Sequence, residues 1–174
     1  MLHFDKEKKT QEFELIKAGR YEVILNAEWK KDSYSDDMII LCTYRVRKDV
    51  EQEAKNRLVF DRIKKDKNGE YHAGKINAIL AAIPNSQTDF ESYDELVQYL
   101  NDKLLNVKIT VVKANPDYPN SKDRNSVEYY STEETKFPEL KNDKVSIEIT
   151  GKSKVEEPKS GGILPQIEED DLPF

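Results

Sequence analysis

Basic and aromatic side chains alternate along residues 20–124 in a pattern that suits a polyanion carrying flat bases. A protein that binds single-stranded nucleic acid needs cations for the phosphates and rings on which bases stack, and each ring contributes about 1–3 kcal/mol. The candidate contacts are Trp29, Lys30, Lys31, Tyr34, Arg45, Arg47, Arg57, Phe60, Arg62, Lys64, Lys65, Tyr71, Lys113 and Arg124, with Tyr118 and Lys122 beside the last two. Tyr21, Tyr44 and Phe60 individually favour a hydrophobic core over a stacking role. Trp29 has a second interpretation as well, because it lies on the same predicted strand face as Val23 and Leu25. If the strands form a barrel, its ring would fill one end of the barrel instead of binding a base.

A second pattern lies at the C-terminus, where four acids precede an apolar tripeptide. The segment consists of Glu168, Glu169, Asp170, Asp171, Leu172, Pro173 and Phe174. An aromatic ring and a free carboxylate at one chain end suit a pocket that is apolar inside and lined by Arg or Lys at its mouth. Pro173 restricts the backbone and so lowers the entropy lost on docking. We expect a partner-docking peptide, with a merely solubilising acidic tail as the alternative.

Residue patterns of enzymes are missing from the chain. There is no phosphate-binding Gly-rich loop, dinucleotide fingerprint or nucleophile elbow, and the chain holds six glycines in all. One cysteine, Cys42, and two histidines do not make a disulfide framework or a Cys/His metal site. Cys42 lies in an apolar stretch and is expected to be a buried small hydrophobe. We expect no enzyme activity, no metal and no cofactor.

The net charge of −6 is concentrated in the tail. Residues 156–174 hold six acids against Lys159, which gives −5 and leaves −1 for residues 1–155. A nearly neutral body still presents a basic groove if its charges are segregated, so the net charge does not exclude a nucleic-acid partner.

The periodicity indicates which elements position the candidate residues. Residues 20–29 alternate apolar and polar side chains as a half-buried strand does, and Ile24 is the exception on the outward face. Ile76, Ile79, Leu80 and Ile83 follow helical spacing, and Ser92 with Glu95 forms a helix-capping pattern. Asn68-Gly69 predicts a tight turn. The expected strands are 20–29, 38–47, 57–63, 105–112, about 127–131 and 145–150, with helices near 76–83 and from 92 onward, after a leading arm over 1–17.

This order predicts a mainly β protein with helices, specifically an OB-fold. Such a fold is a five-stranded, partly open barrel, here with its helices between strands three and four. Another α+β sheet with helices on one face is the alternative. We expect an OB-like domain over residues 1–150 and a flexible, disordered acidic tail over 151–174, where Lys, Ser, Glu, Pro and Gly dominate.

Two resemblances accompany these patterns. Asp170, Asp171, Leu172, Pro173 and Phe174 resemble the acidic tip of bacterial single-stranded DNA-binding proteins, whose terminal Pro-Phe enters pockets on replication and repair proteins. Residues 14–133 resemble a phage family described only as domain of unknown function 669, found among replication and recombination genes. That likeness rests on residues 18–23, 37–40 and 56–61 and on the helix around 75–82. It implies an OB-like fold.

The patterns and resemblances together predict a sequence-tolerant single-stranded DNA-binding protein of phage replication or recombination. Its tip would recruit replication or recombination proteins, and it would work in the cytoplasm of the bacterial host, since no apolar run approaches the length of a membrane span. The alternative is an OB-like adaptor, or a protein that captures host enzymes, which uses the tip without binding DNA. A contiguous basic stripe on strands one to three would favour the DNA-binding protein, and scattered charges would favour the adaptor.

Overall fold

The central element is a long strand, β1 (Gly19–Lys31), whose alternate side chains from Tyr21 to Ala27 are buried. The fold comes from a computed structural model that describes residues 14–141. The chain divides into two units, residues 1–138 and 139–174, and all the described helices and strands lie in the first. After β1 they are β2 (Met38–Val46), β3 (Leu58–Ile63), α1 (Ala73–Ala81), α2 (Tyr93–Leu100), β4 (Lys103–Val112), β5 (Arg124–Val127), the short 3-10 helix η1 (Tyr129–Ser131) and β6 (Glu133–Glu134).

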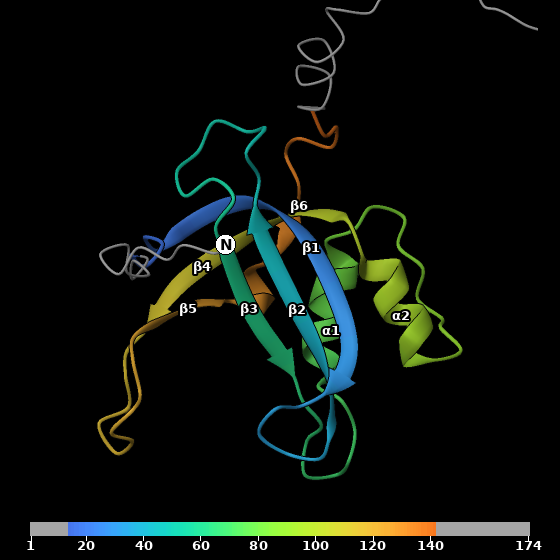
Figure 1. Cartoon of the computed structure of the whole chain (residues 1–174). Helices are drawn as coiled ribbons and strands as arrows, with labels where there is room; N and C mark the ends of the chain where they lie inside the picture. Colours follow the sequence, from blue (N-terminus) through green and yellow to red (C-terminus); the bar gives the residue numbers. More distant parts are fainter. Residues whose placement is uncertain (1–13, 142–174) are drawn as a thin grey trace, which may run out of the picture. The chain divides into compact units, whose positions relative to one another are not determined.

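The six strands form one antiparallel sheet in the order β3-β2-β1-β4-β5, with β6 paired to β4 (Figure 1). β1 pairs with β2 over residues 23–31 and with β4 over residues 19–25. The two ends of the strand order, β3 and β5, lie close to each other although no pairing joins them within residues 14–141. The sheet therefore curls, and the seam between β3 and β5 stays open.

Both helices lie between β3 and β4 in the sequence, and their ends follow the expected local chemistry. The Ser92 hydroxyl accepts a hydrogen bond from the Glu95 amide at 3.1 Å, and the Glu95 carboxylate accepts one from the Glu91 amide at 2.8 Å. α1 begins after His72, whose imidazole accepts the Lys75 amide. The turn at Asn68-Gly69 has Gly69 at φ +82°, a conformation that favours glycine. The capping pattern and the tight turn are confirmed.

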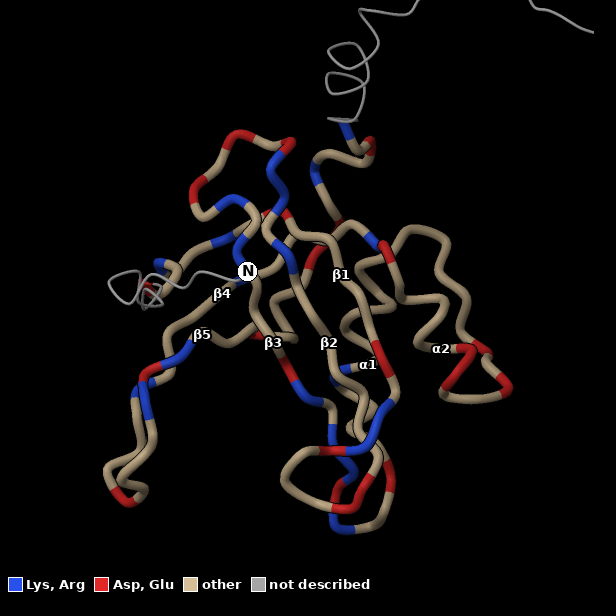
Figure 2. The backbone as a smooth tube through the Cα atoms, in the orientation of Figure 1, with Lys and Arg blue, Asp and Glu red and all other residues tan. Residues whose placement is uncertain are grey.

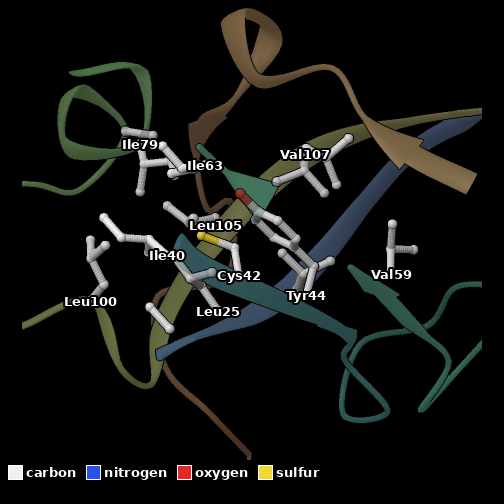
Figure 3. Close-up of a cluster of buried hydrophobic side chains, with 14 of the residues drawn as sticks. Leu25, Ile40, Cys42, Tyr44, Val59, Ile63, Ile79, Leu100, Leu105 and Val107 are labelled. Carbon is white, nitrogen blue, oxygen red and sulfur yellow. The ribbon is translucent and has the colours of Figure 1, made fainter. Parts of the chain in front are cut away.

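Buried side chains of the sheet and of the two helices form the hydrophobic core. Tyr44 from β2 lies among Leu25, Leu105 and Val107, and Ile79 of α1 lies near Ile63 (Figure 3). Tyr21 and Tyr44 are core residues, as expected, and so is Cys42. Burial raises the pKa of the Cys42 thiol to about 12, so the thiol stays protonated at neutral pH.

A buried polar cluster holds the convex side of β1 and β2 at the end of the sheet near Glu22. The Arg47 guanidinium contacts Asp49 at 2.6 Å and Glu22 at 3.8 Å, and donates to the Phe137 carbonyl at 2.7 Å. Glu22 also accepts hydrogen bonds from the Asn106 amide and the Thr135 hydroxyl. Buried charges are tolerated when they are paired and hydrogen-bonded in this way. The cluster fastens residues 135–137 over the convex side of the sheet.

The mainly β fold with helices between strands three and four is confirmed. The strand expected at about 127–131 is wrong: β5 ends at Val127 and the chain continues as the 3-10 helix η1. The expected strand at 145–150, the tail over 151–174 and most of the leading arm lie outside the described residues. Within residues 14–141, no helix combines the length and apolarity that a membrane span requires.

Arg47 and Arg45 offer a matched test of the buried cluster, since they stand two residues apart on one side of the sheet. Replacing Arg47 by Ala leaves Glu22 and Asp49 buried without their cation, so we expect a loss of about 3–5 kcal/mol in the free energy of unfolding. Arg45→Ala removes an exposed side chain and should change it by less than about 0.5 kcal/mol. Urea denaturation measures both, and equal effects would contradict the assigned role of Arg47.

Candidate nucleic-acid interface

The convex face of β2 and β3 exposes both apolar and basic side chains. Because side chains alternate along a strand, β2 turns Leu41, Thr43 and Arg45 outward while Ile40, Cys42 and Tyr44 enter the core. The antiparallel register sets these three outward residues opposite Arg62, Phe60 and Leu58 of β3. Phe60 is 55% exposed and Leu58 46%. These six residues are called the outer face below.

Phe60 lies between two arginines on the outer face. Arg45 is paired with Leu58 and Arg62 with Leu41, so the two arginines stand four residues apart along the strands. At about 3.3 Å per residue this separation is about 13 Å, with Phe60 near the middle. An exposed ring bracketed by cations is the arrangement that a base with its flanking phosphates requires.

A groove of about 750 Å³ follows the open seam between β3 and β5. Leu15, Leu41, Leu58 and Phe60 form its apolar lining. Arg62, Lys64 and Arg124 contribute cations, and Asp61 and Asp123 contribute acids. The groove therefore combines apolar walls with a mixed but partly basic rim.

Asn125 holds the segment before β1, around Ile16, at one side of this groove. The Asn125 amide accepts the Ile16 N–H at 2.9 Å and donates to the Ile16 carbonyl at 2.8 Å. On the other side, the Arg57 guanidinium donates to the Glu14 carbonyl. These contacts hold Leu15 at the groove, beside both β3 and β5.

The loop between β1 and β2 brings a second exposed ring to the outer face. Tyr34 is 77% exposed, and the Arg62 guanidinium lies 4.5 Å from its ring centroid. The buried Asp32 carboxylate lies 3.7 Å from both Arg62 and Lys64. Although burial raises the pKa of Asp32, the Tyr34 backbone N–H, Lys64 and Arg62 together hold this pKa below its ordinary value.

The loop between β4 and β5 is organised by another acid. The Asp123 carboxylate accepts the Ala114 amide at 2.8 Å and contacts the Lys113 ammonium at 3.2 Å. The hydrogen bond from Ala114, followed by that from Lys113, keeps the pKa of Asp123 below its ordinary value. Tyr118 is exposed in this loop.

The candidate cations fall into two groups by partner. Arg45, Arg124 and Lys30 are exposed and have no carboxylate partner among residues 14–141. Arg62 and Lys64 share Asp32, Lys31 pairs with Asp36, and Lys113 pairs with Asp123. Figure 2 shows lysine and arginine at both ends of β3 with acidic residues beside them. The basic residues surround the groove but form no continuous stripe.

Three of the expected contacts have other positions. Arg47 is buried in the ion-pair cluster, and Tyr71 is buried with its hydroxyl bonded to the Trp29 indole and the Met38 carbonyl. Those two predictions are wrong because neither side chain is accessible to a strand on the outer face. Trp29 is half-buried against the core and tilts over Tyr93 at 5.9 Å, which matches its alternative interpretation as a plug. Lys65 lies 5.6 Å from the Tyr71 ring at the same end.

Sequence reasoning missed the apolar lining. Phe60, a candidate contact that also favoured the core by type, lies outside and is 55% exposed. Leu15, Leu41 and Leu58 were not among the candidates, although Leu41 and Leu58 occupy outward positions of alternating strands. Among residues 14–141, no group of three or more His, Cys, Asp or Glu could hold a metal ion. The expected docking tip, residues 168–174, lies outside the described residues.

Fold and site together define a small curled β-sheet protein with an exposed aromatic and basic face beside a groove. Its sequence matches the family described as protein of unknown function (DUF669) over residues 2–143, and the chain belongs to this family. The predicted resemblance to that family is thereby confirmed. No curated protein matches the chain significantly in sequence.

Phe60 and Ile63 both lie on β3, and replacing each in turn distinguishes an outer-face residue from a core residue by the loss of stability. Phe60→Ala removes a half-exposed ring, so we expect the free energy of unfolding to fall by less than about 1 kcal/mol. Ile63→Ala opens a cavity in the core and should cost about 2–5 kcal/mol. Thermal or urea denaturation measures both. A larger cost for Phe60→Ala than for Ile63→Ala would show that Phe60 belongs to the core.

Proposed function

We propose that this protein binds single-stranded DNA across the outer face and the adjoining groove, with little dependence on base sequence. The observation that carries the proposal is Phe60, an exposed ring between Arg45 and Arg62 beside a groove with apolar walls. Bases would stack on Phe60 and Tyr34, and phosphates would contact Arg45, Arg62, Lys64 and Arg124. Lys30 and Lys31 at the end of β1 and Lys113 in the 113–123 loop would extend the basic rim.

The finer assignment as an OB-fold belongs to the same proposal. The strand order β3-β2-β1-β4-β5 with β3 near β5, and the helices between β3 and β4, are what a partly open five-stranded barrel requires. In such barrels the face of strands two and three, flanked by the loops after strands one and four, takes oligonucleotides. The outer face and the loops that carry Tyr34 and Tyr118 occupy the corresponding positions.

The acidic tip completes the proposal as a second binding element. Asp170, Asp171, Leu172, Pro173 and Phe174 would dock on replication or recombination proteins of a phage-infected cell, as the likeness to bacterial single-stranded DNA-binding proteins implies. Because the tip is acidic, it would also compete weakly with DNA for the basic rim. The protein would then protect single strands and bring enzymes to them.

The adaptor is the second candidate, and the charge distribution favours it. Arg62, Lys64, Lys31 and Lys113 each have a carboxylate partner, and the basic residues form no continuous stripe. A protein that joins replication enzymes through its tip, or captures host enzymes with it, needs no free cations. The adaptor hypothesis predicts that removing residues 168–174 abolishes binding to the partner protein, and that the chain has no affinity for DNA.

Titration of a labelled oligo-dT with the full chain at low salt tests the DNA-binding proposal. We expect Phe60→Ala to weaken binding by about 1–3 kcal/mol, since stacking on its ring is lost. Arg45→Ala should reduce the slope of log K against log salt by about 0.7, the contribution of one phosphate contact on a single strand. Tyr130→Ala and Lys103→Gln are the matched controls, because these side chains lie off the outer face: Tyr130 is an exposed ring on η1, and Lys103 lies over the Tyr99 ring of α2. Absence of binding by the full chain at low salt would exclude the proposal in favour of the adaptor.

A chain that ends at Gly151 separates the two binding elements. Since the tail carries acids and the candidate rim carries cations, its removal should leave affinity for oligo-dT unchanged or tighter, with the larger gain at low salt. Fluorescence anisotropy of the two chains side by side measures this. Loss of DNA binding on truncation would place the DNA contacts in the tail and contradict the assignment to the outer face.

A further inference from the structure

The loop over residues 32–37 is exposed except for one carboxylate at its start. The Asp32 side chain is 1% exposed, whereas Ser33, Tyr34, Ser35, Asp36 and Asp37 face solvent. The Asp32 amide donates to the Asp37 carbonyl at 2.8 Å, which closes the loop. Its Oδ2 accepts the Ser35 hydroxyl at 3.3 Å. Asp32 therefore closes the loop around Tyr34 through its contacts with Ser35 and Asp37.

The same carboxylate also reaches β3. Oδ1 lies 3.7 Å from Arg62 Nε, and Oδ2 lies 3.7 Å from Lys64 Nζ. Oδ1 is buried and accepts no hydrogen bond. Since an unpaired buried acceptor is costly, this oxygen favours a position of the Arg62 guanidinium close to it. Loop and strand are thus joined by one acid that contacts both.

Arg62 in turn covers one side of the Tyr34 ring. The guanidinium carbon lies 4.5 Å from the ring centroid, and the ring is otherwise open to solvent. A planar guanidinium stacked on an aromatic face favours one ring orientation. The three side chains form a chain of contacts from Asp32 through Arg62 to Tyr34, with the free face of Tyr34 at its end.

We propose that Asp32 is a positioning residue that holds Tyr34 and Arg62 together as one preformed stacking site for a nucleotide base. The proposal rests on the proposed function and names a part of the same interface. A ring already fixed in its binding orientation loses less conformational entropy when a base stacks on it. Asp32 itself is buried and touches no nucleotide.

A simpler role for Asp32 would be to neutralise Arg62 and Lys64 and so oppose phosphate binding. The geometry argues against this as the main effect. Both contacts, at 3.7 Å, are longer than hydrogen bonds, and the Arg62 and Lys64 side chains are partly open to solvent. A guanidinium has five N–H donors and an ammonium three, so both cations keep donors for phosphate. The two roles predict opposite effects of removing the acid.

The test is a double-mutant cycle on oligo-dT binding with Asp32→Asn, Tyr34→Ala and both changes together. In the otherwise unchanged chain, Tyr34→Ala should weaken binding about ten-fold, the effect of losing one stacking ring. Asp32→Asn should also weaken binding, and in its presence Tyr34→Ala should have little further effect. The slope of log K against log salt should not become steeper. Asp36→Asn is the matched control, because Asp36 carries the same charge in the same loop but contacts Lys31 rather than β3.

Arg62→Lys provides a second route to the same result without disturbing the loop. It keeps the charge but loses the planar group over Tyr34, so the Tyr34→Ala effect should again disappear. Tighter binding by Asp32→Asn with a steeper salt slope would overturn the positioning role, and so would a full Tyr34→Ala effect in both backgrounds. No binding by the unchanged chain would overturn the proposed function and this inference with it, whereas binding that is insensitive to Asp32→Asn would overturn the inference alone.

Discussion

The double pairing of β1 is the constraint on which the rest of the structure depends. β1 pairs with β4 through its first half and with β2 through its second, and the two pairings overlap only at residues 23–25. A twisted strand shared in this staggered way cannot lie in a flat sheet, so its neighbours diverge and the sheet curls. The curl brings β3 toward β5, and the groove with its apolar lining is the seam that remains.

The curl also determines which charges are available at the surface. At one end of the convex side, residues 135–137 cover Arg47, which becomes a structural cation held by Asp49 and Glu22. Two residues earlier, on β2, Arg45 is exposed and unpaired within the described part of the chain. Arg45 and Arg47, the residue just past the end of β2, thus have different roles on one side of the sheet, and the covering segment decides between them.

The sequence predicted the elements well where the signal is local. Alternation in β1, the Ser92 cap, the Asn68-Gly69 turn and the burial of Cys42 each depend on residues near one another in the chain. Apart from the strand expected at about 127–131, the errors concern side chains whose environment comes from distant segments. Tyr71 is buried because it bonds to Trp29, 42 residues away, and Arg47 because it binds the carbonyl of Phe137, 90 residues away. Phe60 faces outward because its pairing with Thr43 of β2 sets which side of the sheet its side chain occupies. The residues of β3 alone do not reveal which of the two sides is covered.

The polar groups of the outer face and the groove support the sequence tolerance of the proposed binding. Reading a base requires side-chain donors and acceptors held in fixed positions against its edges. The one amide that lines the groove, Asn125, directs its donor and its acceptor to the backbone of Ile16. The carboxylate of Asp123 is engaged by Ala114 and Lys113, and that of Asp32 is buried. Apart from the Thr43 hydroxyl, the outer face and the groove lining offer a ligand mainly ring faces, leucine side chains and cations, and stacking and phosphate contacts depend little on base identity.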